Sequence, residues 1–265
     1  MKKEYSYPSI SQIENLAVRL IELNRELAEK NMQLEKSELA RKNMFSNVTH
    51  DLRAPVAAIR GATERLCSGG IDDDERNKMI RIIDTRVEAL DHLIGDLYYS
   101  TLVEQPDFLP KLSHHKIAPV LEEYAISLNG SGRLRDREGR LSIPAGFDAC
   151  VMLDPQYFSR VMENLTSNAL RHTKKNDVIE LGCRANENLV EIYVRDTGSG
   201  ISERDLPFIF DHTFAGEYSR TPGKSGSGLG LSIARAIIEK HGGTIDCHSV
   251  YGEGATFIIS LPEAP

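Results

Sequence analysis

The chain has 265 residues, enough for two domains, and 40% of them are hydrophobic, as in an ordinary globular protein. Its net charge of −7, from 32 basic and 39 acidic residues, would repel a phosphate backbone, so we expect no direct nucleic-acid partner. No stretch reaches the roughly 18 to 20 apolar residues that span a bilayer, and the charged start has no secretory signal. We therefore expect a cytoplasmic chain, either on its own or as the soluble part of a membrane-anchored receptor.

The four cysteines lie far apart in the sequence and form no C-x-x-C pair. This spacing favours buried, reduced thiols over a zinc site or a disulfide framework. A reducing compartment is the corresponding expectation.

A long helix is predicted at the start of the chain. Its first apolar residues alternate three and four apart, which is a coiled-coil pattern: Ile13, Leu16, Leu20, Leu23, Leu27 and Leu34. A second row keeps the spacing after a four-residue insertion into the heptad: Phe45, Val48, Leu52, Pro55 and Ile59. We expect the helix to continue through the insertion, to kink at Pro55 and to end at Cys67-Ser68-Gly69-Gly70.

A second helix is predicted to open with the acidic run 72–75, because negative side chains suit the positive end of a helix dipole. It carries one apolar stripe: Met79, Ile83, Val87, Leu90, Ile94 and Leu97. The two helices form an antiparallel hairpin with too little apolar cover of its own. Pairing of two copies into a four-helix bundle, and hence a homodimer, is the expected solution.

Three prolines between residues 104 and 119 interrupt the periodicity and indicate a linker. Beyond it, helices are expected at about 120–128, 155–172 and 229–240, and strands at 178–183, 189–195, 244–250 and 255–261. This order predicts an α+β domain with helices on one face of a mixed, largely antiparallel sheet. The predicted domains are 1–44 (coiled coil), 45–104 (helical hairpin), 105–118 (linker) and 119–265 (α/β sandwich).

His50 is the first candidate for chemistry. On a helix it falls roughly 170° from the centre of the apolar row, so it faces water and is not a core histidine. A merely solvated histidine remains the alternative. Asp51, however, can accept a hydrogen bond from one ring nitrogen, which leaves the other nitrogen as a nucleophile on a largely neutral imidazole.

Asp196 ends a strand in which Val190, Ile192 and Val194 share its face. A carboxylate in an apolar layer needs a partner, either backbone N–H groups or a ligand. The following turn, 197–200, is built of small residues that let a flat ligand approach the backbone. The run Asp-Thr-Gly-Ser also occurs in aspartic proteases, but this helix-rich chain has no second such motif.

Asn164, Asn168 and Arg171 recur four and three residues apart, so they share one side of a helix. Amide oxygens can join water around Mg²⁺, and a guanidinium can neutralise phosphate. A solvated polar face is the alternative.

A glycine run, residues 224–231, stands directly before a predicted helix, where bare N–H groups and the helix dipole can hold phosphates. It lacks the Lys-Ser/Thr ending of a P-loop and follows no strand, which excludes the Walker and Rossmann motifs.

Together these motifs resemble the histidine kinase family, and the resemblance covers nearly the whole chain after about residue 45. Residues 45–55 look like the phosphoacceptor box, 163–173 like the N box, and 196–200 like the first glycine box. The order continues with the F box at 208–210, the second glycine box at 226–231 and a closing glycine box at 252–257.

The resemblance implies an ATP-dependent protein histidine kinase that phosphorylates its own His50, with Asp51 as base or orienting group. The phosphoryl group would pass to an aspartate in the receiver domain of a response regulator, and an upstream sensor domain or partner would supply the signal. The catalytic domain would have the fold of gyrase B and MutL, with ATP and Mg²⁺ as cofactors.

In that fold Asp196 would contact the adenine amino group, Asn168 would hold Mg²⁺, and Asn164 and Arg171 would assist at the phosphates. Residues 210–226 would form the ATP lid. The remaining nucleotide-binding candidates are Gly198, Gly200, Lys224, Gly226, Gly228, Leu229, Gly230 and Thr256.

The chain departs from the family pattern in three places. Ala215 stands where an arginine of the lid is usual, and Arg220 or Lys224 are the candidates to replace it. His172 stands where tyrosine is common, which we interpret as tolerated packing. Ala54 lies four residues after His50, where Thr or Asn usually holds the water that attacks the phosphorylated regulator, so we predict a weak phosphatase.

Two other functions fit parts of the sequence. A non-catalytic dimeric scaffold that binds nucleotide would explain Ala215, but not the intact His50 and Asp51. An ATPase or chaperone of the same superfamily would have no use for the helix that carries His50.

Overall fold

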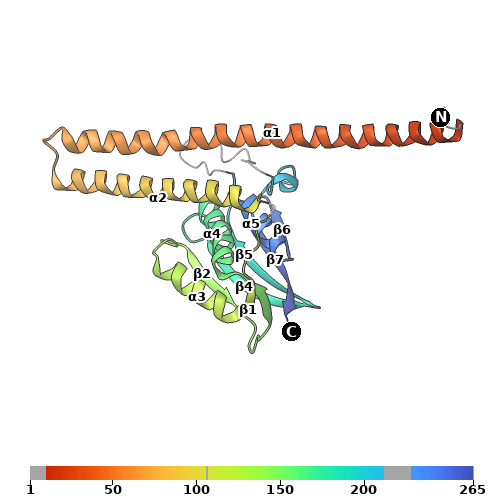
Figure 1. Ribbon diagram of the computed structural model, residues 1–265. Helices are drawn as coiled ribbons and strands as arrows, with labels where there is room; N and C mark the ends of the chain where they lie inside the picture. The colour runs from red at the N-terminus through yellow and green to blue at the C-terminus, as the bar shows by residue number, and fades with distance from the viewer. Residues whose placement is uncertain (1–9, 106, 212–227, 265) are drawn as a thin grey trace. The chain divides into compact units, whose positions relative to one another are not determined.

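The computed structural model describes residues 10–105, 107–211 and 228–264 (Figure 1). Its internal contacts divide the chain into two units, with the boundary between Ser46 and Asn47. The first unit is the opening part of one helix, and the second contains the helical hairpin and the sheet domain.

Helix α1 runs without interruption from Ile10 to Cys67, 58 residues, so the predicted continuity through the heptad insertion is confirmed. Pro55 lies inside the helix. The helix ends before Gly69 and Gly70, whose positive φ angles of 72° and 67° are those that glycine adopts without strain. In the opening unit the leucines at 20, 23, 27 and 34 are exposed, a coiled-coil row without cover from the described residues.

Helix α2 runs from Asp73 to Val103. Its N-cap is Asp72, whose carboxylate accepts a hydrogen bond of 2.7 Å from the N–H of Glu75. Arg65, near the end of α1, donates two hydrogen bonds of 2.7 and 2.9 Å to the Glu75 carboxylate and so closes the hairpin. Neither described helix of the hairpin, nor any other described helix, is long and apolar enough to cross a bilayer.

The hairpin has a buried side and an uncovered side. On α1 the buried row contains Val48, Pro55 and Ala62, spaced as the sequence predicts for an inner face. On α2 Ile80, Val87 and Ile94 are seven residues apart and 51%, 46% and 58% exposed. Apolar side chains in such a row favour a partner surface over water.

The sheet domain follows, with these elements: β1 (Ser113–Lys116), α3 (Ile117–Gly130), β2 (Glu138–Ser142), β3 (Cys150–Leu153), α4 (Pro155–His172), β4 (Val178–Asn186), β5 (Leu189–Asp196), the 3-10 turn η1 (Leu206–Phe208), α5 (Gly230–Lys240), β6 (Thr244–Val250) and β7 (Gly254–Ala264). The three predicted helices and four predicted strands are present. The strands β1, β2 and β3 are not among the predicted elements, and β1 falls in the segment predicted as linker.

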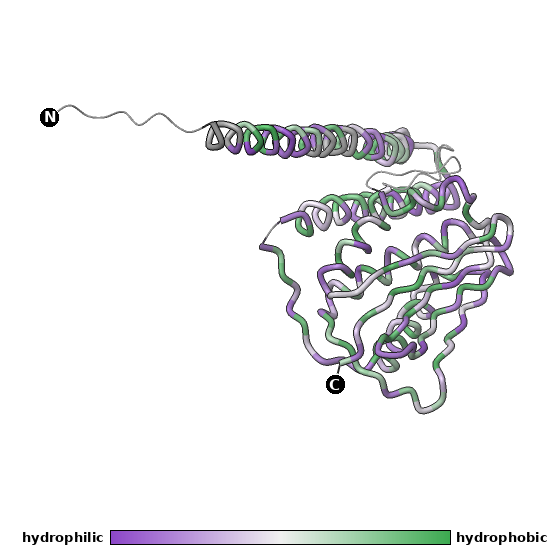
Figure 2. The backbone as a smooth tube through the Cα atoms, turned by 90° about the vertical axis from the view of Figure 1, so that its right-hand side faces the viewer, coloured by the Kyte–Doolittle hydropathy of each residue, from purple (hydrophilic) through white to green (hydrophobic). Residues whose placement is uncertain are grey.

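The strand order is β1-β3-β7-β5-β4-β2, with β6 paired to β7. Among the described strands only β2 and β4 pair in parallel, so the predicted mixed, largely antiparallel sheet is confirmed. Helices α3, α4 and α5 contact the sheet, and one face of the strands is buried beneath them (Figure 1). Along β5, Val190, Ile192 and Val194 are buried, whereas Leu189 and Arg195, on the other face, are exposed. Figure 2 shows this alternation of hydrophobic and hydrophilic residues along the strands.

None of the four cysteines forms a disulfide. Burial raises the pKa of Cys183 to about 11 and that of Cys247 to about 12, so both thiols stay protonated at neutral pH. They act as small apolar side chains of the sheet domain.

His241 joins the end of α5 to the start of α4. It is 5% exposed, its Nδ1 lies 2.7 Å from the carbonyl oxygen of Ile237, and its Nε2 accepts a hydrogen bond of 3.0 Å from the N–H of Asp154. Asp154 in turn is the N-cap of α4 and accepts a hydrogen bond from Gln156. Nδ1 therefore carries the proton, and burial lowers the pKa of the ring.

This lowered pKa predicts acid sensitivity. The unfolded chain takes up a proton on this histidine near pH 6.5, before the folded chain does, so stability is full above that pH and falls below it. One such proton changes the free energy of unfolding by at most about 1.4 kcal/mol per pH unit. Denaturant unfolding measured at several pH values between 7.5 and 5 gives the free energy of unfolding as a function of pH. This free energy should fall less steeply with decreasing pH in His241→Gln, because glutamine keeps a donor and an acceptor but does not titrate. Identical pH profiles for the two proteins would contradict the assignment.

Candidate functional site

His50 projects into water from α1, with 83% of its side chain exposed. Its Nδ1 lies 3.4 Å from Oδ1 of Asp51, whose side chain is 16% exposed. With the proton on Nδ1, this carboxylate orients the ring and Nε2 keeps its lone pair toward solvent. The pair can therefore act as a nucleophile with an orienting group.

Asp196 is 4% exposed at the end of β5. Its Oδ1 accepts a hydrogen bond of 2.9 Å from the N–H of Gly198. Burial raises the pKa of the carboxyl group, and hydrogen bonds from the backbone of Gly198 and Ala255 oppose that shift. A buried carboxylate held from one side by backbone N–H groups is a ready acceptor for an N–H donor on a ligand.

The backbone packs too tightly around this carboxylate for side chains larger than hydrogen. A Cβ atom on Gly198 would lie 2.4 Å from the carbonyl oxygen of His172, and one on Gly200 would lie 2.1 Å from that of Val250. A Cβ atom on Gly254, where φ is 108°, would lie 2.0 Å from the carbonyl oxygen of Asp196 itself. These glycines therefore allow the ends of α4, β5 and β6 and the start of β7 to lie close together.

Helix α4 positions the polar row predicted from the sequence. Asn164 and Asn168 are half-buried, and Arg171 is exposed at the end of the helix. The Asn164 amide donates a hydrogen bond of 2.9 Å to the carbonyl oxygen of Gly230, the first residue of α5. The polar row of α4 therefore contacts the start of α5, the helix that follows the second glycine run.

The end of α4 is held by hydrogen bonds from Arg137, a residue that is not among the predicted site residues. Its guanidinium donates hydrogen bonds to the carbonyl oxygens of Leu170 (2.9 Å) and Thr173 (2.8 Å) and to Oγ1 of Thr173 (2.7 Å). The neighbouring carbonyl of His172 accepts a hydrogen bond of 3.1 Å from the N–H of Ser199. Arg137 has no periodic signal, because it lies in a loop 33 residues from its nearest partner on α4.

The glycine run before α5 is described only from residue 228. Gly228 has a positive φ of 68°, and Leu229 is fully buried. The candidates Lys224 and Gly226, as well as Ala215, Arg220 and most of the expected lid, lie outside the described residues. Before that gap, the ring of Phe210 packs edge-on against Phe257 at 6.3 Å between centroids.

Thr256, another predicted nucleotide-binding residue, does not lie on the same face of the sheet as Asp196. In the register of β5 and β7, Thr256 lies opposite Arg195 and Ala255 lies opposite Asp196. Residues that lie directly opposite in an antiparallel pair share a face, so Thr256 is on the face of the sheet away from Asp196. The sequence placed it wrongly because the register was not known, and Ala255 is the neighbour of the carboxylate.

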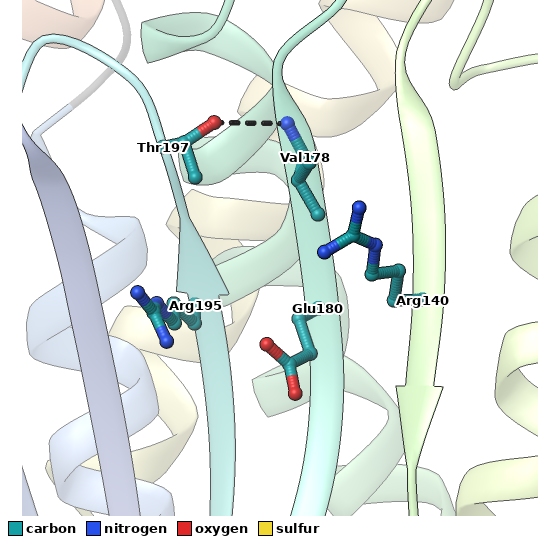
Figure 3. A pocket seen from close by; sticks show the side chains of 5 residues that line it. All are labelled: Arg140, Val178, Glu180, Arg195 and Thr197. Carbon is teal, nitrogen blue, oxygen red and sulfur yellow. Dashed lines mark hydrogen bonds between the residues drawn. The ribbon is translucent and has the colours of Figure 1, made fainter.

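A small pocket of about 90 Å³ opens on that other face, lined by Arg140, Val178, Glu180, Arg195 and Thr197 (Figure 3). The Thr197 hydroxyl accepts a hydrogen bond of 2.9 Å from the N–H of Val178. The pocket contains none of the predicted site residues, and Arg140 is already paired with Glu138. We assign it no ligand.

No cluster of three His, Cys, Asp or Glu side chains suited to a metal exists among the described residues. A magnesium ion near Asn168 would thus be held by amide oxygen, water and the oxygens of a bound phosphate chain, which is a common arrangement for Mg²⁺. The buried Asp196, the glycine contacts around it and the row on α4 fit a flat base with an amino donor and a polyphosphate.

Two family models match the chain. The His Kinase A (phospho-acceptor) domain matches residues 40–105, and the histidine kinase-, DNA gyrase B-, and HSP90-like ATPase matches residues 153–265. Sensor protein SrrB of Staphylococcus aureus is 33% identical over 228 residues, which cover 84% of this chain and 38% of that protein. The chain thus spans 38% of the length of this curated relative.

Solved structures share the fold. Acinetobacter baumannii histidine kinase AdeS is similar with a TM-score of 0.61 and 21% identity, over 82% of this chain and 98% of that one. Histidine kinase ThkA, in a complex with response regulator protein TrrA, is similar with a TM-score of 0.65 and 24% identity, over 84% of this chain and 62% of that one.

The close approach at Gly198 can be tested by Gly198→Ala. The added methyl group would meet the carbonyl oxygen of His172, so we expect a loss of about 1–3 kcal/mol in the free energy of unfolding. Gly61→Ala is the matched control, since no atom lies within 4 Å of its Cβ position on helix α1. Denaturant unfolding that shows no loss in Gly198→Ala would contradict the contact.

Proposed function

Because the chain belongs to the sensor histidine kinase family, we propose that it phosphorylates its own His50 from ATP and passes the phosphoryl group to an aspartate of a response regulator. The observation that carries the proposal is the pairing of two sites in one chain. One is an exposed histidine with an orienting carboxylate, and the other is a buried carboxylate in a glycine-lined turn.

In this proposal the lone pair on Nε2 of His50 attacks the γ-phosphorus of ATP. The bond to the β–γ bridging oxygen breaks, and ADP leaves. Asp51 keeps the Nδ1 proton in place and stabilises the positive charge that develops on the ring. The phosphorylated nitrogen then gives its phosphoryl group to a carboxylate of the regulator, which restores the neutral imidazole.

The nucleotide would bind at the second site. Asp196 accepts a hydrogen bond from the adenine amino group, and Gly198 and Gly200 let the base reach the backbone. Asn164 and Arg171 act at the phosphates, together with Gly228, Leu229 and Gly230 before α5 and with Lys224 and Gly226 of the glycine run. Asn168 would hold Mg²⁺, which neutralises charge on the phosphates when bound.

A second copy of the chain would cover the exposed apolar face of the hairpin. The uncovered row of Ile80, Val87 and Ile94 suits a homodimeric four-helix bundle. We assign residues 1–44 to a coiled coil that receives a signal from an upstream sensor domain or partner, 45–104 to dimerisation and phosphotransfer, 105–118 to a linker and 119–265 to catalysis. The proposed compartment is the cytoplasm, where ATP and response regulators are found.

His50→Gln tests the phosphoacceptor. The change removes the nucleophile but leaves the nucleotide site intact, so we expect labelling from γ-labelled ATP to be abolished and nucleotide affinity to stay within about twofold. The label in the wild type should be acid-labile and base-stable. Equal labelling of both proteins would refute the role of His50. Nucleotide binding by the wild type without any labelling would favour the alternative function, a non-catalytic dimeric scaffold.

Asn168→Ala and Asp196→Asn test the nucleotide site. Each leaves a group of the bound nucleotide or its metal unmatched, at a cost of about 1–3 kcal/mol, or about 5- to 150-fold in Kd. Isothermal titration with a non-hydrolysable ATP analogue and Mg²⁺ measures the loss. Native affinity in both variants would overturn the site.

Ala54 is exposed on α1 and offers no hydrogen bond to a water molecule. We therefore expect the wild type to be a poor phosphatase of its phosphorylated regulator and Ala54→Thr to be faster, by about tenfold or more. Purified phosphorylated regulator, mixed with either protein in buffer without ADP, gives the rates. Rapid dephosphorylation by the wild type, unimproved by the substitution, would show that another group positions the water.

A further inference from the structure

Helix α4 ends without a glycine cap. Its C-cap residue is Thr173, which has extended backbone angles of φ −103° and ψ 157°, and Lys174 follows it. The last four carbonyl groups of an α-helix have no partner inside the helix, and a glycine just after the helix often allows the chain to turn back and satisfy some of them. In α4 other groups must donate these hydrogen bonds.

Two donors from outside the helix bind its last turn. The Arg137 guanidinium donates to the carbonyl oxygen of Leu170 (2.9 Å) and to the carbonyl and hydroxyl oxygens of Thr173 (2.8 and 2.7 Å). Between these acceptors lies the carbonyl oxygen of His172, which accepts a hydrogen bond of 3.1 Å from the N–H of Ser199. Arg137 and the turn 197–200 therefore hold the same end of α4.

The shape of the Arg137 side chain matters for this contact. The residue is half-buried, and a further hydrogen bond, of 3.4 Å, goes to the carbonyl oxygen of Leu134. All four acceptors are neutral oxygens, and a positive charge is favourable at the negative end of a helix dipole. The planar fork of a guanidinium reaches several acceptors at fixed angles, which the single ammonium group of lysine does not. Arg137 thus fixes the direction of the helix end.

The turn 197–200 connects this helix end to the Asp196 carboxylate. The N–H of Gly198 donates a hydrogen bond of 2.9 Å to Oδ1 of Asp196. A Cβ atom on Gly198 would lie 2.4 Å from the carbonyl oxygen of His172, so the backbone of the turn lies directly against the helix end. A shift of the His172 carbonyl group therefore moves Ser199 and Gly198 together, and with them the donor that orients the carboxylate.

The opposite side of the turn is held by β6 and β7. The N–H of Gly252 donates a hydrogen bond of 2.8 Å to the carbonyl oxygen of Ser199. The Ser249 hydroxyl accepts one of 2.8 Å from the N–H of Ile201 and donates one of 2.7 Å to the carbonyl oxygen of Gly254. These contacts join the turn to the sheet itself, whereas its contact with α4 depends on how the helix end is held.

The proposed phosphate contact at Asn164 is held by a different bond. Asn164 stands about two turns before His172 and donates its hydrogen bond to Gly230 at the start of α5. Loosening the last turn of α4 therefore affects the part of the site proposed for the base and leaves this bond in place.

We propose that Arg137 is a positioning residue for the adenine end of the nucleotide site. Its guanidinium holds the end of α4 so that the turn presents the Asp196 carboxylate to the base. The inference rests on the proposed function, because it takes Asp196 as the acceptor of the adenine amino group. It predicts a specific defect in Arg137 variants, namely weaker binding of ATP with little change for inosine triphosphate, which lacks the amino group.

The test is isothermal titration of the full chain with ATP and with inosine triphosphate, in the presence of Mg²⁺ and with His50→Gln to prevent turnover. Arg137→Lys keeps the charge but not the fork. It should bind ATP about tenfold more weakly and inosine triphosphate within about twofold of the parent protein, so that the ratio of the two affinities falls to about twofold or less. Arg137→Gln should give the same ratio, because the geometry and not the charge is responsible.

Two further variants complete the experiment. Arg135→Gln is the matched control, since it removes an exposed charge from the same loop and should leave both affinities unchanged. Thr173→Val removes the hydroxyl acceptor of Arg137 but keeps the shape of the side chain, so it should lower the ratio in the same direction. The double variant Arg137→Lys with Thr173→Val should lose no more than Arg137→Lys alone, because both changes break one contact.

A native ratio in Arg137→Lys, with the parent protein discriminating, overturns the inference and leaves the proposed function standing. That holds even where the melting temperature falls, because Arg137 is then only structural. A ratio lost in Arg137→Gln but kept in Arg137→Lys also overturns it, since charge is then the cause. Loss of the fold in both Arg137→Lys and Thr173→Val, measured by circular dichroism, overturns it as well, because the bonds then support the whole domain.

The parent protein itself tests the premise. If it binds neither nucleotide, the proposed function is refuted. If it binds both equally, the role of Asp196 is refuted. The inference about Arg137 falls in both cases.

Discussion

The burial of Asp196 is the constraint on which the proposed nucleotide site depends. A carboxylate that is 4% exposed at the end of a strand must be matched by donors, and the N–H groups of Gly198 and Ala255 supply part of that match. These donors reach the carboxylate only because Gly198, Gly200 and Gly254 allow the backbones of α4, β5, β6 and β7 to approach one another. Arg137 then holds the end of α4 where the turn requires it.

Parts of this arrangement could be predicted because their signals are local. Helix α4 has the predicted bounds, 155–172, and the apolar row along it is a local signal. In the structure Asp154 caps this helix and Pro155 is its first residue. The strands β1, β2 and β3 were missed because they are only four or five residues long, and β2 is exposed throughout. The position of Thr256 depends on strand register, which no local pattern reveals. An ion pair between Asp96 on α2 and Arg160 on α4 joins residues 64 apart in sequence, so no local spacing could indicate it.

The two chemical sites lie in different parts of the fold. His50 is on α1, exposed and oriented by its neighbour in sequence, so its geometry depends on the helix alone. Asp196 and the row on α4 depend on the sheet domain. A phosphoryl transfer between them requires the reacting atoms to come within about 3–3.5 Å.

The central claim is that the Asp196 carboxylate accepts a hydrogen bond from the adenine amino group. Its most direct test compares ATP with inosine triphosphate, which carries an oxygen in place of that group. Isothermal titration with Mg²⁺ and with His50→Gln, which prevents turnover, gives both affinities. The account predicts at least about tenfold weaker binding of inosine triphosphate, because a carboxylate would then face an acceptor. It also predicts that Asp196→Asn removes most of this discrimination. Equal affinity of the His50→Gln protein, with Asp196 intact, for the two nucleotides would contradict the account.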